Sequence, residues 1–118
     1  MANTIQYYDG MSAHFWKLDS DATGGFSSAV FTRNFRVLDV NCQVITGAPG
    51  ATMTIARIRS TVATTLCTLD VSATGPAVLT SNISQTVGLF ESGDTLRVTT
   101  SSAATVANVF IYVMQFSI

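Results

Sequence analysis

The stretch that decides the fold class is FRVLDVNCQVIT, residues 35–46. Apolar and polar residues alternate along it, and the apolar row is made of Leu38, Val40, Cys42 and Val44. A period of two is typical of a β-strand that buries one face and exposes the other to water. We therefore expect a strand over residues 35–46 with this row turned toward a core.

Similar strand-like segments lie on both sides of this stretch, and Gly- and Pro-containing turns separate many of them. Strong helix formers are scarce, and β-branched residues dominate. The expected strands span residues 12–17, 26–33, 51–59, 64–71, 77–80, 84–90, 95–99 and 105–117. So many short strands in 118 residues predict an all-β fold, namely a two-sheet antiparallel sandwich that is jelly-roll-like.

The length of the chain corresponds to one domain. Within it we distinguish residues 1–34, an N-terminal arm or edge strand with the first strands, from residues 35–118, the sandwich core. The N-terminal part carries a cluster of large apolar side chains, namely Tyr7, Tyr8, Met11, Phe15 and Trp16. Exposed apolar clusters are costly, so we expect this segment to dock, either on its own barrel or on a partner.

The last expected strand is apolar on both faces. One face carries Val109, Ile111 and Val113, and the other carries Phe110, Tyr112, Met114 and Phe116. In a two-layer sandwich only one face of each sheet meets the core. The aromatic face therefore needs a cover, which is either the N-terminal segment of the same chain or another subunit.

Charged residues make up 11% of the chain, and the net charge is −1. Nucleic-acid binding requires a basic field, and a membrane span requires ~20 consecutive apolar residues, so we expect neither kind of partner. Sparse charge is typical of interface cores. Arg57 and Arg59 share a strand face at a spacing of two, and we expect them to form solvated or intersubunit ion pairs.

Two cysteines, Cys42 and Cys67, lie in strand-like apolar contexts. We expect buried, reduced thiols, and the alternative is a bridge between two facing sheets. The N-terminus lacks the basic and apolar regions of a secretory signal, so we expect synthesis in the cytoplasm, where disulfides are disfavoured.

Candidate catalytic and metal-binding groups are few. His14 is the single histidine and no nucleophile-elbow motif accompanies it, so we expect no enzyme and no cofactor. The stretch DSDATG, residues 19–24, copies the start of a calcium loop, but Val30 stands where a bidentate acid is required. We interpret Gly93 and Asp94 as a structural turn in which the carboxylate bonds to a backbone N–H two residues on.

The order of parts from residue 35 onward is FRVLDVNCQVI, TGAPGA, TMTIARI, ESGDTLRVTT and finally VANVFIYVMQFSI. This order, with the SGDTLRV turn and strand of residues 92–98, resembles the small jelly-roll or β-sandwich proteins of tailed-phage virions. Head decoration (cement) proteins belong to that group. The resemblance implies a non-enzymatic virion protein on the capsid surface, a homotrimer whose further partner is the major capsid protein.

A second function of a different class also fits a β-sandwich. A carbohydrate- or receptor-binding module of a phage fibre or lectin would use exposed aromatic side chains with polar neighbours. Trp16, Tyr7 and Tyr8 could serve in that way.

Overall fold

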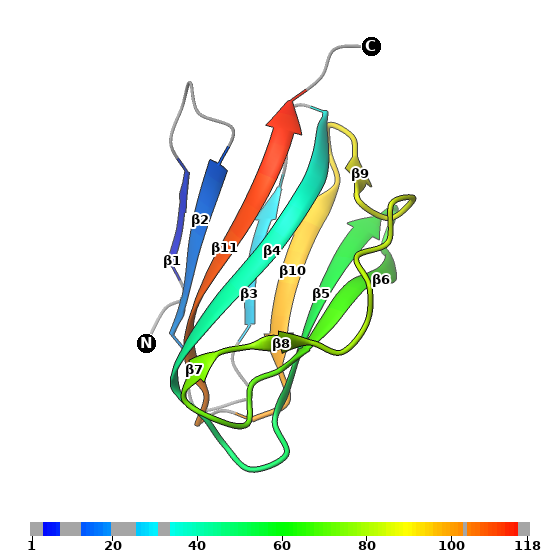
Figure 1. Ribbon diagram of the computed structural model, residues 1–118. Coiled ribbons are helices and arrows are strands. Elements are labelled where there is room, and N and C mark those ends of the chain that lie inside the picture. Colours follow the sequence, from blue (N-terminus) through cyan, green and yellow to red (C-terminus); the bar gives the residue numbers. More distant parts are fainter. Residues whose placement is uncertain (1–3, 8–12, 20–25, 31–33, 103, 116–118) are drawn as a thin grey trace.

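The computed structural model describes residues 4–7, 13–19, 26–30, 34–102 and 104–115. These residues form eleven β-strands and no helix, and the strands make two antiparallel sheets that pack together (Figure 1). The prediction of an all-β, two-sheet antiparallel sandwich is confirmed. The strand order does not establish a jelly roll, and that part of the prediction stays open.

The first sheet has the order β1-β2-β11-β4-β7, and β9 pairs with β4 off this path. Its strands are β1 (Thr4–Tyr7), β2 (Ala13–Asp19), β4 (Phe35–Thr46), β7 (Gly75–Pro76), β9 (Leu89–Phe90) and β11 (Val106–Gln115). The two long strands, β4 and β11, lie side by side in its middle. The N-terminal strands extend this sheet, because β2 pairs with β11 and β1 forms the edge.

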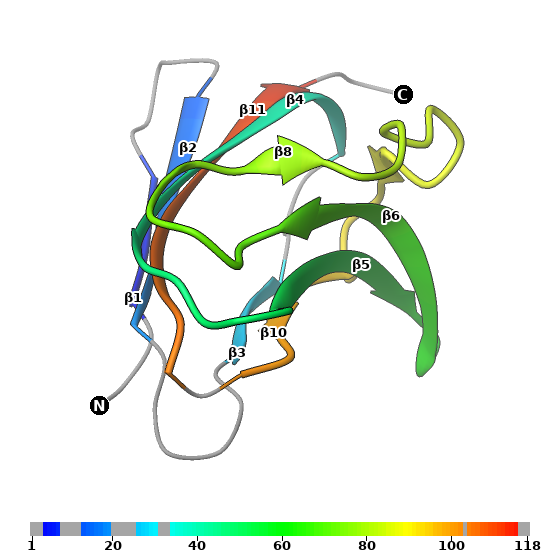
Figure 2. The same ribbon diagram turned by 60° about the horizontal axis from the view of Figure 1, so that its bottom comes forward.

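The second sheet has the order β3-β10-β5-β6-β8. Its strands are β3 (Phe26–Val30), β5 (Thr52–Arg59), β6 (Val62–Asp70), β8 (Val78–Leu79) and β10 (Thr95–Thr100). Figure 2 shows this sheet facing the first one across the interior.

The core is made of the inward rows of both sheets. The first sheet contributes Val40, Cys42, Val44, Val109, Ile111 and Val113, and the second contributes Met53, Ile55, Cys67, Leu69, Leu96 and Val98. Each of these side chains is at most 5% exposed. Full burial of one aliphatic side chain is worth about 1.5–3 kcal/mol, so these rows are the main source of stability.

Two β-bulges interrupt the alternation of β4 where it pairs with β11. Leu38 is the extra residue at one bulge and Ile45 at the other. Leu38 is 51% and Ile45 48% exposed, whereas Val37 is buried. The prediction that Leu38 belongs to the buried row was therefore wrong. An extra residue shifts a period-two pattern by one, so Val37 takes the inward position.

The prediction of a strand over residues 84–90 was also wrong for most of that segment. Only Leu89–Phe90 is strand, and residues 84–88 form a turn in which Gly88 N donates to Ser84 O at 2.8 Å. The Arg57 Nη1 group donates to the carbonyl oxygens of residues 86, 87 and 89. These carbonyls are thus satisfied by a side chain instead of a neighbouring strand.

The remaining expected strands are present, several with shifted ends, and residues 12, 31–33 and 116–117 of the expected strands lie outside the described residues. Residues 35–46 are strand throughout, and the segments expected at 12–17 and 26–33 are strand over Ala13–Asp19 and Phe26–Val30. The segment expected at 77–80 is strand only at Val78–Leu79.

Cys42 and Cys67 are free thiols, buried in the first and the second sheet respectively. Burial raises the pKa of each thiol to about 11. Both groups therefore stay protonated at neutral pH and are poor nucleophiles.

The bulge at Leu38 gives a direct test of the register. Val37→Ala removes buried methyl groups and should lower the free energy of unfolding by about 2 kcal/mol. Leu38→Ala changes an exposed side chain and should alter it by no more than about 0.5 kcal/mol. Urea unfolding of the two variants, at a protein concentration where both are monomeric, measures the difference. A larger loss for Leu38→Ala would contradict the register.

Candidate functional site

The outer face of the first sheet carries aromatic side chains. Val109, Ile111 and Val113 of β11 are buried in the core. The alternate residues belong to the opposite face of the strand, where Phe110 is half-buried and Tyr112 is 36% exposed. Strand β11 therefore presents aromatic groups on the side of the sheet away from the core.

Neighbouring residues of β4 enlarge this face. The register places Asn41 opposite Phe110 and Asp39 opposite Tyr112. Both polar residues are exposed, and the bulge beside them exposes Leu38. We call Leu38, Asp39, Asn41, Phe110 and Tyr112 together the outer β4–β11 surface. Aromatic groups such as its Phe110 and Tyr112 are enriched at protein–protein interfaces, and polar groups such as its Asp39 and Asn41 are typical of their rims.

The other predicted interface residues are placed only in part. Tyr8, Met11 and Phe116 lie outside the described residues. Met114 belongs to β11, where its register partner is Arg36. The backbone register sets Phe15 opposite Phe110, Trp16 opposite Val109 and Tyr7 opposite His14.

The N-terminal segment forms part of this chain's own sheet. Strand β2 pairs with β11 from Val106 to Tyr112, and it lies beside β11 instead of over its face (Figure 1). Of the two expected forms, arm or edge strand, the described residues have the edge strand. Strands β1 and β2 therefore widen the first sheet and leave Tyr112 exposed on its outer face.

Gly93 and Asp94 lie in a tight turn between β9 and β10. Asp94 N donates to Glu91 O at 2.9 Å, which closes the turn. Gly93 has a φ of +96°, a backbone conformation that residues with a Cβ rarely adopt. Glycine at the third position of such a turn is a conformational requirement.

The Asp94 carboxylate, whose side chain is 5% exposed, forms three strong contacts. It accepts hydrogen bonds from Arg59 Nη2 at 2.6 Å, from Arg59 Nε at 2.9 Å and from Glu91 N at 2.8 Å. We expected the Asp94 carboxylate to accept a hydrogen bond from a backbone N–H two residues later in the chain. That expectation was wrong, because the backbone donor is the N–H of Glu91, three residues earlier. Arg59 thus forms ion pairs within its own chain, and because its side chain is 37% exposed and that of Glu91 is 59% exposed, the solvated form of the two expected kinds of pair is present.

These contacts determine the protonation of Asp94. Burial raises the pKa of the carboxyl, but the hydrogen bonds from Arg59 and from Glu91 N outweigh it, so the pKa lies below its ordinary value. Asp94 is therefore ionised at neutral pH and fastens the turn to β5. Its role here is structural, since a charge neutralised so closely is poorly placed to act on a ligand.

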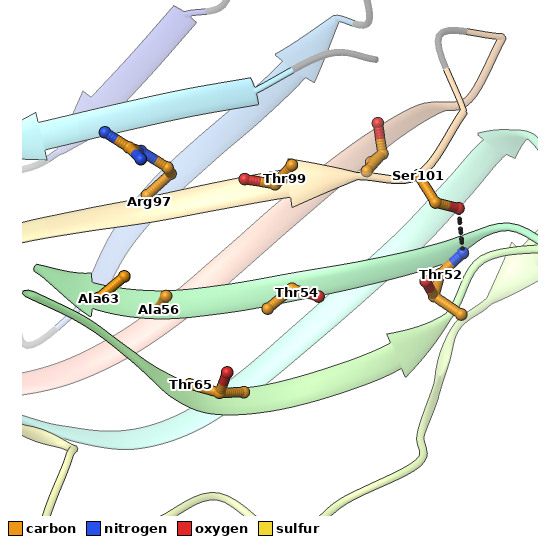
Figure 3. Close-up of a pocket in the computed structure, with 9 residues that line it drawn as sticks. Thr52, Thr54, Ala56, Ala63, Thr65, Arg97, Thr99 and Ser101 are labelled. Carbon is orange, nitrogen blue, oxygen red and sulfur yellow. Dashed lines mark hydrogen bonds between the residues drawn. The ribbon is translucent and has the colours of Figure 1, made fainter.

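A second surface lies on the outer face of the second sheet. It is a hollow of about 400 Å³ over β10, β5 and β6 (Figure 3). Alternate residues of these strands line it, among them Thr52, Thr54, Ala56, Thr65, Arg97 and Thr99. The sequence analysis missed this hollow. The available signal was the regular alternation of Thr with buried residues in TMTIA and TLRVT.

Other candidate chemistry is absent from the parts of the chain that the structure describes. They contain no group of three or more His, Cys, Asp or Glu residues that could hold a metal ion. They also contain no helix long and apolar enough to cross a membrane. The calcium-loop stretch lies outside these parts except for Asp19, which ends β2.

Comparison with protein families, with curated proteins and with solved structures finds no match to this chain. The fold and its surfaces define a small β-sandwich module with two different outer faces. The first sheet presents an aromatic surface, and the second presents a hollow lined by hydroxyl groups.

The pairing of Asp94 with Arg59 gives a stability prediction. Asp94→Ala removes the acceptor of charged hydrogen bonds and should lower the free energy of unfolding by about 2 kcal/mol. Glu91→Ala is the matched control, because Glu91 lies 3.8 Å from Arg59 with a side chain that is 59% exposed. The control should change stability by less than about 0.5 kcal/mol in denaturant unfolding. Equal losses in the two variants would contradict the role given to Asp94.

The lowered pKa of Asp94 also predicts a pH dependence. The unfolded chain holds this proton more tightly than the folded chain, so the contribution of Asp94 is complete above the unfolded pKa of about 3.9. It is lost as the pH falls through the lower, folded pKa. The stability difference between the wild type and Asp94→Asn should therefore be constant near neutral pH and shrink in acid. A difference that grows in acid would contradict this assignment.

Proposed function

We propose that this chain is a virion structural protein, a capsid decoration protein that binds and stabilises the outside of a phage head through subunit contacts. The observation that carries the proposal is the outer β4–β11 surface. It lies on a strand whose inner face is already buried in the core, and it leaves Leu38 and Tyr112 exposed.

The position of this surface suits docking against another protein. Strand β11 lies between β2 and β4, so its backbone is hydrogen-bonded on both sides. A surface held in this way loses little conformational freedom on binding. Aromatic groups such as Phe110 and Tyr112 are enriched at the cores of interfaces, where charged groups are depleted.

One edge of each sheet is made of very short strands, whereas the opposite edges, β1 and β3, have four and five residues. Strands β7 and β9 pair with β4, and β8 is the last strand of the second sheet, yet each contains only two residues. Such short strands offer few backbone groups to an incoming strand.

The resemblance of residues 35–118 to tailed-phage virion proteins supports the location on the capsid surface. It also supports the homotrimer and the major capsid protein as partners, with synthesis in the host cytoplasm. Cyclic homo-oligomers use one patch per subunit repeatedly, which is compatible with a single surface on each chain.

Assembly is tested by light scattering at micromolar concentration. We expect an oligomer for the wild type and a monomer for Tyr112→Lys, because the interface would have to desolvate the ammonium group, and an ion pair with Asp39 on β4 offsets only part of that cost. Val62→Lys is the control, since Val62 is 63% exposed in β6, outside the outer β4–β11 surface. It should leave the oligomer intact. A monomeric wild type would contradict self-association.

Capsid binding is tested by co-sedimentation with heads of the virus that encodes the chain. The wild type and Val62→Lys should sediment with heads, and Tyr112→Lys should stay in the supernatant. If the wild type stays in the supernatant, the decoration role is wrong even where the protein self-associates.

A further inference from the structure

The hollow on the second sheet lies on the opposite side of the sandwich from the outer β4–β11 surface (Figures 1 and 3). It is a shallow depression of about 400 Å³ that is open to solvent, so a ligand there would keep much of its surface in contact with water. A ligand there would not compete with assembly through the first sheet.

Hydroxyl groups line the hollow on three adjacent strands. The register places Thr99 of β10 opposite Thr54 of β5, and Ala56 of β5 opposite Thr65 of β6. Figure 3 shows these side chains on the same side of the sheet. In the described part of the chain, the hydroxyls of Thr54, Thr65 and Thr99 make no hydrogen bond. Each can both donate and accept, which matches a ligand that itself carries hydroxyl groups.

Arg97 is the cation of the hollow. It is exposed, and its register neighbours are Ser28 on β3 and Ala56 on β5. Within the described residues it makes no hydrogen bond and no ion pair, unlike Arg57, which donates to carbonyls of residues 86, 87 and 89, and Arg59, which binds Asp94. The planar guanidinium binds a carboxylate through two parallel hydrogen bonds.

Among the described residues, no carboxylate lines the hollow to neutralise Arg97. The one acidic residue of the strands β5, β6 and β10 is Asp70, opposite Thr52 at the far end of β5. Its carboxylate already accepts hydrogen bonds from the N–H and the hydroxyl of Ser72. The positive charge is therefore available to a ligand.

Small side chains keep the surface open. Ala56 and Ala63 occupy positions where longer side chains would fill the hollow. Their methyl groups, with those of the threonines, offer apolar contact to the C–H groups of a ring. The hollow thus combines apolar contact, hydroxyl groups and one cation.

We propose that this hollow binds an acidic saccharide, with its carboxylate on Arg97 and its hydroxyl groups on Thr54, Thr65 and Thr99. A neutral saccharide would leave the guanidinium without a partner. A peptide strand would find no free backbone groups here, because β10 and β5 are paired on both sides. The proposal is independent of the decoration role, since it uses the opposite sheet.

The test is an NMR titration of isotope-labelled protein with tri-galacturonic acid, compared with maltotriose and with tri-glutamate. We expect tri-galacturonic acid to shift the amides of residues 52–56, 63–65 and 97–101. Arg97→Gln should weaken binding at least about tenfold, and Arg97→Lys should retain part of the affinity. Thr65→Val should weaken binding, whereas the neighbouring control Thr64→Val, outside the hollow, should not.

Three results would overturn the proposal. The first is an absence of shifts in these amides. The second is evidence that the cation plays no role, namely binding of maltotriose as tight as that of tri-galacturonic acid, or binding of tri-galacturonic acid by Arg97→Gln as tight as by the wild type. The third is equal binding of tri-glutamate, which would make the ligand a carboxylate-bearing peptide. The titration is repeated with Tyr112→Lys, which should bind tri-galacturonic acid like the wild type even though it does not assemble.

Discussion

The antiparallel pairing of β4 with β11 is the constraint on which the rest of the structure depends. These strands form the middle of the first sheet, and each contributes a continuous row to the core. Because one face of the pair is fully occupied by the interior, whatever apolar groups remain must lie outside. The exposed aromatic surface is therefore a consequence of how the core is built.

The second sheet is fastened to its neighbouring loops by side chains of one strand. Arg57 holds the carbonyls of the turn before β9, and Arg59 binds Asp94 at the start of β10. Both arginines belong to β5, so this one strand binds the turns before and after β9. Arg97 of β10, by contrast, lines the hollow on the outer face and stays unpaired among the described residues.

The sequence predicted what depends on local pattern and missed what depends on distant partners. The alternation in residues 35–46 indicated the strand and most of its buried row. It could not place Leu38, because a bulge is defined by the register of β11, some seventy residues away. The same reason hid the pairing of Asp94 with Arg59. The hollow was missed because its threonines come together only when three strands are set side by side.

The two buried thiols can report when the two sheets of the sandwich separate. Cys42 lies in the first sheet and Cys67 in the second, and each is at most 1% exposed. A reagent that alkylates thiols can reach either one only when the layers separate or the protein unfolds. The rate of labelling, compared between free protein and assembled particles, would measure how far assembly suppresses this opening of the sandwich.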